Sequence, residues 1–174
     1  VNGKSQRSLP DQQKIREWMD RHPSGLDEDV IRMRQENKER IINIFIRKIE
    51  EGEISNTVFT LKPEWSHQEK FDKMSEWWDS RLFQLKFAIR SPGLLNEMLD
   101  YSLDPDTMEI LYEAREAGIP FFVNPYYLSL LNTRSMGGRV ASDQAIRDYI
   151  IYSRYLVEEF GHIVAREKED VVEL

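Results

Sequence analysis

Large apolar side chains recur at intervals of three and four between residues 67 and 89. The stripe consists of Phe71, Met74, Trp78, Leu82, Leu85 and Ile89, with Trp77, Phe83 and Phe87 beside it. This spacing is typical of one face of an α-helix. Ser66 and Glu69 match the capping box that begins many helices, so the helix should start at residue 67. We therefore expect one helix over 67–89 that forms the hydrophobic spine of the domain.

Similar patterns predict about five further helices and an all-α, irregular multi-helix fold. They lie at about 10–22, 27–51, 93–100, 105–117 and 143–165, the last headed by Ser142. Proline or glycine closes most of them, as expected for helix ends. The polar first half of 27–51 predicts a solvated face, so only its second half should need a deep neighbour.

Residues 57–61 alternate in the manner of a short strand. Because no second strand is apparent to pair with them, an extended connector is the favoured interpretation. The domain organisation that follows is a flexible arm at 1–9, a single helical domain at 10–165 and a charged tail at 166–174. That tail suits a truncation point or a linker.

Composition excludes several classes of function. The net charge of -7 argues against nucleic-acid binding, which depends on clustered lysine and arginine. No apolar run reaches the roughly 18 residues that a membrane helix needs, and we expect a cytoplasmic protein. The absence of cysteine excludes disulfides, thiol catalysis and thiolate-held zinc or iron–sulfur clusters within these 174 residues.

The residues that usually carry chemistry are scattered. His22, His67 and His162 fall in three different predicted helices, so a shared metal site is disfavoured. Glu159 and His162 form one Glu-x-x-His pair, whereas carboxylate-bridged metal bundles use two. A polar helix face explains that pair more simply. The loop at 136–139 lacks the lysine and the spacing of a phosphate-binding loop, and no catalytic triad is apparent.

An uncharged stretch, NPYYLSLLN at 124–132, stands out in a chain of which 32% of the residues are charged. Pro125 fixes the backbone, and Tyr126 and Tyr127 each offer an aromatic face and a hydroxyl group. The two tyrosines either fill the core or line a pocket. On physical grounds alone, core filling is the favoured interpretation.

Two segments carry a resemblance to a known family. Residues 120–132, PFFVNPYYLSLLN, resemble the T-P-Y-Y-x-S-L-[IM]-D signature of the lysine 2,3-aminomutase family. Trp78, the run Phe83-Gln84-Leu85 and Ile89 resemble that family's W-x-x-x-x-W-Q-L-x-x-x-I helix. The resemblance covers about residues 77–132.

Three positions depart from the family pattern. Phe83 stands for the second tryptophan, Asn124 for threonine and Asn132 for aspartate. In the family, a loop then leads towards cluster-binding cysteines, whereas here a long helix is predicted.

The resemblance implies a parent enzyme that moves an amino group between neighbouring carbons. Such an isomerase uses S-adenosylmethionine, a four-iron cluster and pyridoxal phosphate. The chain has no cysteine for the cluster and no lysine in a recognisable pyridoxal-binding context, so it should be inactive alone. Its expected partner is the catalytic barrel of the same polypeptide, or a second subunit. Tyr126 and Tyr127 are the candidate cofactor-binding residues, near the cofactor cavity of the parent.

Two other functions remain open at this point. The chain could be a stand-alone helical protein–protein interaction module, or, less favourably, a carboxylate-bridged metal bundle. Metal analysis of the purified chain separates the last from the other two.

Overall fold

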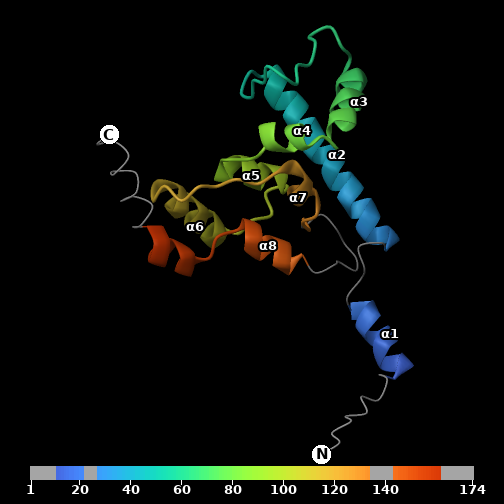
Figure 1. Cartoon of the computed structure of the whole chain (residues 1–174), viewed down its shortest axis with the longest axis vertical. Helices are drawn as coiled ribbons and strands as arrows, with labels where there is room; N and C mark the ends of the chain where they lie inside the picture. Colours follow the sequence, from blue (N-terminus) through green and yellow to red (C-terminus); the bar gives the residue numbers. More distant parts are fainter. Residues whose placement is uncertain (1–10, 22–26, 134–142, 162–174) are drawn as a thin grey trace, which may run out of the picture.

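The computed structural model describes residues 11–21, 27–133 and 143–161, and the regular elements within these ranges are all α-helices (Figure 1). They are α1 (Gln12–Arg21), α2 (Glu28–Glu50), α3 (His67–Trp77), α4 (Arg81–Lys86), α5 (Pro92–Met98), α6 (Pro105–Glu116), α7 (Pro125–Ser129) and α8 (Gln144–Ile150). Residues 154–161 are helical as well. The predicted all-α class is confirmed, with more and shorter helices than expected. The predicted arm and the charged tail lie outside the described residues.

Helix α2 is the element on which the described fold is assembled, because α3, α5 and α7 all pack against it (Figure 1). Its bounds agree with the predicted 27–51 to within one residue. Glu28 and Asp29 lie in its first turn and Arg47 and Lys48 in its last, where they complement the helix dipole. Gly52 ends the helix with a φ of 76°, a conformation that glycine adopts readily.

The first half of α2 is more buried than its polar sequence predicted. Val30 and Met33 are buried, and Asn37 is fully buried. The expectation that only the second half has a deep neighbour is therefore wrong. The covering element is α7, which lies about ninety residues further along the chain and is invisible to a local pattern.

The predicted spine over 67–89 is two helices instead of one. The capping box is present, with Ser66 Oγ accepting from the Glu69 amide at 3.3 Å, but α3 ends at Trp77. The Ser80 amide donates to the Trp77 carbonyl, and α4 then begins. Because of this interruption, the residues of α4 do not continue the buried face of α3. Leu82 and Leu85 are therefore each 45% exposed, although the apolar pattern predicted that they face the core.

Four phenylalanines occupy the centre of the core and come from different segments. The group comprises Phe45 of α2, Phe59 of the connector, Phe83 of α4 and Phe87 just after it. In five of the six pairs the ring centroids are 4.5–6.4 Å apart in edge-on or tilted arrangements, the geometry that aromatic pairs prefer. Phe59 anchors residues 57–61, which form no strand and act as the connector that was favoured.

Helix α6 begins as its sequence predicted. Asp104 caps it by accepting from the Thr107 amide at 2.9 Å, and this bond holds the pKa of the Asp104 carboxyl below its usual value. Pro105 occupies the first turn, and Gly118, with a φ of 79°, follows the last. Beyond α6, Val123 exchanges two backbone hydrogen bonds with Ile89, which fixes the approach of the chain to α7.

The predicted helix over 143–165 is also interrupted. Asp143 is the N-cap of α8, whereas Ser142 lies outside the described residues. Residues 151–153 are not helical, and the Ser153 hydroxyl accepts from the Leu156 amide at 3.3 Å where the helix resumes. The break lets the Tyr152 hydroxyl donate to the Pro120 carbonyl, and burial raises the pKa of this tyrosine.

Among the described helices, none combines the length and the apolar character that crossing a bilayer requires.

Candidate functional site

The uncharged stretch at 124–132 forms the short helix α7 and the turn that follows it. Asn124 is the N-cap and accepts from the Tyr127 amide at 2.8 Å, and Pro125 occupies the first position. The Ser129 hydroxyl donates back to the Tyr126 carbonyl at 2.7 Å. Leu128 and Leu131 are fully buried and hold this segment in the core.

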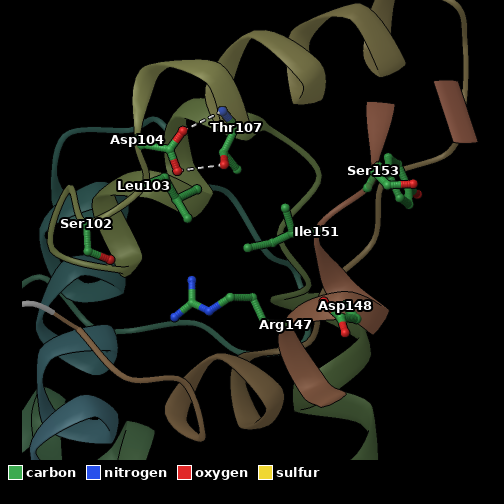
Figure 2. Close-up of a pocket in the computed structure, with 9 residues that line it drawn as sticks. Ser102, Leu103, Asp104, Thr107, Arg147, Asp148, Ile151 and Ser153 are labelled. Atoms are coloured by element: carbon green, nitrogen blue, oxygen red, sulfur yellow. Dashed lines mark hydrogen bonds between the residues drawn. The ribbon is translucent and has the colours of Figure 1, made fainter. Parts of the chain in front are cut away.

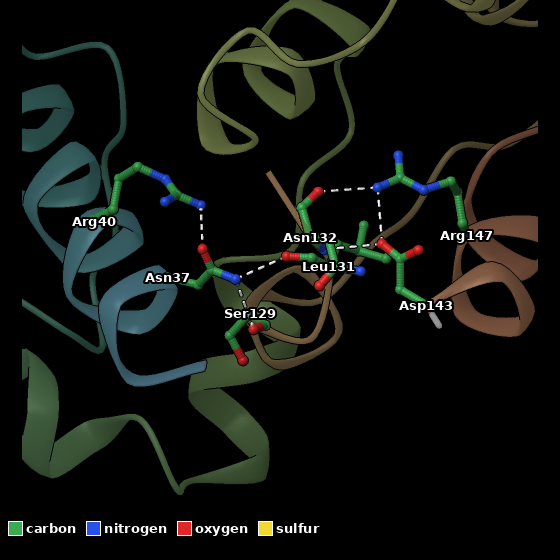
Figure 3. Close-up of polar contacts among 7 residues, drawn as sticks. All are labelled: Asn37, Arg40, Ser129, Leu131, Asn132, Asp143 and Arg147. Carbon is green, nitrogen blue, oxygen red and sulfur yellow. Dashed lines mark hydrogen bonds and ion pairs between the residues drawn. The ribbon is translucent and has the colours of Figure 1, made fainter. Parts of the chain in front are cut away.

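A buried amide on α2 holds α7 in place. Asn37 Nδ2 donates to the carbonyl oxygens of Ser129, at 3.1 Å, and Leu131, at 2.8 Å (Figure 3). Its Oδ1 accepts from Arg40 at 2.7 Å, and Arg40 Nε donates to the Met98 carbonyl at 3.2 Å. Burial lowers the pKa of the Arg40 guanidinium, which nevertheless stays charged at neutral pH. These bonds satisfy carbonyls at the end of α7 that the helix itself leaves open.

On the other side, the same turn is tied to α8. The Asn132 amide donates to Asp143 Oδ2 at 2.8 Å. Arg147 donates to the Asn132 carbonyl at 3.0 Å and to the same Asp143 oxygen at 2.8 Å (Figure 3). The turn after α7 therefore lies between α2 and α8 and is held from both directions by polar contacts.

Besides the backbone pairing of Ile89 with Val123, a side chain joins the two segments that resemble the aminomutase family. Gln84 Oε1 accepts from the Tyr126 amide at 2.8 Å, and Gln84 Nε2 donates to the Trp78 carbonyl at 2.6 Å. Gln84 thus connects the helix break after Trp78 with the first turn of α7. These residues lie close together in the fold although Gln84 and Tyr126 are 42 positions apart in the sequence.

The two predicted site tyrosines lie at the surface. The side chains of Tyr126 and Tyr127 are 50% and 39% exposed, so the interpretation that both fill the core is wrong. Buried Pro125 and Leu128 fill it instead, because the short helix turns the tyrosines outwards. The Tyr127 ring lies 6.1 Å from that of Tyr126 and 6.0 Å from that of Tyr149, which is 76% exposed. The three rings form an exposed aromatic row across α7 and α8.

A hollow of about 220 Å³ opens beside this row. One face of α2, the end of α3 and the segment around α7 line it with Ile31, Arg34, Gln35, Lys38, Trp78, Tyr126, Ser129 and Leu130. The Lys38 ammonium lies 5.4 Å from the centroid of the Trp78 ring, a cation–π geometry. The hollow and the tyrosine row together form the surface that we call the α2–α7 face.

A second hollow of about 250 Å³ lies between the beginning of α6 and α8 (Figure 2). Its charged lining is mixed and consists of Asp104, Arg147 and Asp148. Arg147 and Asp104 already serve as the tie to Asn132 and the cap of α6. These charged groups therefore already have structural roles, and the hollow offers no uniform charge to a ligand.

The metal-bundle hypothesis finds no support among the described residues, where no group of three potential ligands of the His, Cys, Asp and Glu types comes together. The His67 ring nitrogen Nε2 lies 2.9 Å from Asn43 Oδ1 at the surface, as expected for a first-turn residue. His22, His162 and the loop at 136–139 lie outside the described residues.

No protein-family model matches the chain, and no solved structure matches it. A curated protein does. Over 162 residues, or 90% of this chain, the sequence is 26% identical to an uncharacterized KamA family protein of Methanocaldococcus jannaschii. The chain is similar to a KamA family protein. It spans only 21% of that relative's length.

The similarity to the KamA family protein extends well beyond the resemblance at 77–132, because it takes in 90% of the chain. It therefore includes most of α2 as well as the two motif segments. This matters for the candidate site, since α2 supplies Asn37 and half of the hollow lining.

Sequence reasoning missed Asn37 and Gln84. Asn37 could have been found, because Val30, Met33, Asn37, Ile41 and Phe45 follow one helical stripe on α2 and only the asparagine is polar. A polar residue within an apolar stripe is expected to have a specific partner. The role of Gln84 depends on the helix break after Trp77, for which no strong local signal was apparent.

Proposed function

We propose that this chain is the helical region of a longer radical enzyme of the lysine 2,3-aminomutase type. In this proposal the chain packs its helices on the catalytic barrel of the same polypeptide, or on a second subunit, and is not catalytic alone. The similarity to a KamA family protein supports the proposal, and so does the small share of that relative that the chain spans.

The observation that carries the proposal is the contact made by Gln84. The tryptophan helix and the P-Y-Y-x-S-L segment were matched to the family separately, yet Gln84 bonds to both Trp78 and Tyr126. A chance resemblance in either segment gives no reason for the two to meet. Their contact suggests that the signature residues act together, as a support that holds α7 in a fixed position.

The residues of this chain do not fit an iron–sulfur cluster. Clusters of this type are held by cysteine thiolates, and the 174 residues contain no cysteine. In the proposed enzyme the remaining polypeptide supplies the cluster ligands. Pyridoxal phosphate and S-adenosylmethionine, when bound there, supply the radical chemistry that moves the amino group.

The contribution of this chain is a rigid, exposed aromatic surface. Tyr126 and Tyr127 project from a helix that Asn37 and Gln84 hold at both ends. Their exposure leaves rings and hydroxyl groups available to the remaining polypeptide, and we propose that they approach its cofactor cavity. Soluble domains seldom expose contiguous aromatic groups unless a partner covers them.

The coding sequence downstream of residue 174 tests the proposal. We expect a Cys-x-x-x-Cys-x-x-Cys motif there, followed by the alternating strands and helices of a barrel. A natural protein that ends at residue 174 would instead favour a stand-alone helical interaction module. A longer protein without the cysteine motif would exclude a radical enzyme of this type.

A further inference from the structure

The hollow of the α2–α7 face presents a uniform charge. Its charged lining residues are Arg34 and Lys38, and no carboxylate lines it, although the chain as a whole carries a net charge of -7. Within the described residues Lys38 forms no ion pair, and its ammonium is held over the Trp78 ring. A half-buried cation above an aromatic surface attracts an anion more strongly than a solvated lysine does.

The rest of the lining is apolar or aromatic. Ile31, Arg34, Gln35 and Lys38 follow one face of α2, at positions i, i+3, i+4 and i+7. Ile31 is 51% exposed and Tyr126 is 50% exposed. Ile31 and Gln35 on this face of α2 are exposed and Lys38 is half-buried, so the hollow offers an apolar group and a cation side by side.

The volume of the hollow indicates whether it binds a whole cofactor or the side chains of a polypeptide segment. Pockets for cofactors and drug-sized molecules usually enclose about 300 to 1,000 Å³. The hollow measures about 220 Å³ and is open to solvent. It suits one or two side chains of a polypeptide better than a whole cofactor.

We infer that the hollow is the docking site for an acidic segment of the polypeptide outside residues 1–174. In this segment an aspartate or glutamate pairs with Lys38, and a neighbouring apolar side chain packs against Ile31 and Tyr126. The inference rests on the proposed function, since it requires the longer enzyme. It adds the chemistry of the contact, which combines a carboxylate and an apolar side chain.

Site-specific photo-cross-linking in the full-length protein tests the inference. Ile31 is replaced by p-benzoylphenylalanine, and the cross-linked peptides are identified by mass spectrometry. The matched control carries the same amino acid at Val58, which is 52% exposed but lies on the connector after α2. We expect position 31 to cross-link to a segment beyond residue 174 that contains a carboxylate beside an apolar residue. Position 58 should not reach that segment.

A second variant tests the charge. Lys38→Gln in the cross-linker background should lower the yield at position 31 several-fold and remove its dependence on salt. Lys73→Gln is the control, because Lys73 lies over Trp77 at 5.5 Å, much as Lys38 lies over Trp78, but outside the hollow. Lys73→Gln should leave the yield unchanged.

Several results would overturn the inference: cross-links to a second copy of the chain, to residues within 1–174 alone, or to a segment without a carboxylate. An unchanged yield in Lys38→Gln would do the same. These outcomes are separate from a failure of the proposed function. An enzyme that binds its cluster but cross-links elsewhere loses only the docking site, whereas a protein without the cysteine motif loses the proposed function.

Discussion

The side-chain oxygen of Gln84 accepts a hydrogen bond from the backbone amide of Tyr126 at 2.8 Å, across 42 positions of the sequence. The same glutamine donates to the Trp78 carbonyl at 2.6 Å. One half-buried side chain therefore joins the break between α3 and α4 to the first turn of α7. The exposed tyrosines of α7 depend on this contact for their position.

Replacing Gln84 with methionine tests that dependence. Methionine keeps the approximate size of the side chain but removes both hydrogen bonds, so we expect the free energy of unfolding to fall by about 1.5 kcal/mol. Urea denaturation of the 174-residue chain measures it. Gln68→Met, at an exposed position of α3 where the side chain bonds only Asp72, should change stability by less than about 0.5 kcal/mol. Equal effects of the two substitutions would contradict the role given to Gln84.

A substitution at Asn37 should destabilise the fold more than one at Gln84, because Asn37 is fully buried. Asn37→Leu leaves the carbonyl oxygens of Ser129 and Leu131 without their donor, and we expect a loss of about 3 kcal/mol. Hydrogen exchange should also accelerate selectively in α7. Asn43→Leu, on the exposed face of the same helix, is the control; it removes only the surface contact with His67 and should cost less than about 1 kcal/mol. A neutral Asn37→Leu variant would show that α7 does not need this contact.

Because the helix is interrupted after Trp77, we expect substitutions at two neighbouring residues to have very different effects on stability. Phe83 is fully buried among three other phenylalanines, so Phe83→Ala should cost about 3 to 5 kcal/mol. Leu82→Ala should cost less than about 1 kcal/mol, because Leu82 is 45% exposed. A single continuous helix over 67–89 predicts the reverse order. Thermal denaturation of both variants under the same conditions decides between the two arrangements.

Local signals in the sequence predicted where most helices begin. Ser66 with Glu69, and Asp104 with Pro105, act within four residues and appear in the structure as expected. The ends of α2 and α6 at Gly52 and Gly118 could be predicted equally well, because a positive φ favours glycine. Beginnings and ends of helices depend on neighbouring residues, and this is why the all-α fold could be predicted.

The interruptions within helices could not be predicted in the same way. The break after Trp77 is held by Gln84, whose other partner is the remote Tyr126, and the break after Ile150 allows Tyr152 to reach Pro120. Both are tertiary effects that override an unbroken local pattern. The exposure of Tyr126 and Tyr127 follows from the same cause, since the side of α7 that is buried depends on where α2 lies.

The tyrosines themselves lead to a functional prediction. If the full-length protein is the proposed enzyme, Tyr126→Phe and Tyr127→Phe should each lower the retention of pyridoxal phosphate during gel filtration, measured by absorbance. Their folding stability should change by less than about 0.5 kcal/mol, because both side chains are partly exposed. Tyr155→Phe, at a site that is 66% exposed outside the α2–α7 face, is the control. Unchanged cofactor retention and turnover in both variants would remove these residues from the cofactor site.

We propose that the chain is part of a radical enzyme whose cluster lies elsewhere in the same polypeptide. Iron and sulfide analysis of the anaerobically reconstituted full-length protein tests this most directly. We expect about four iron atoms per chain. We expect none for residues 1–174 treated in the same way, because they contain no cysteine. Serine at the three cysteines of the downstream motif should abolish the iron, and a full-length protein that binds no cluster at all would contradict the account.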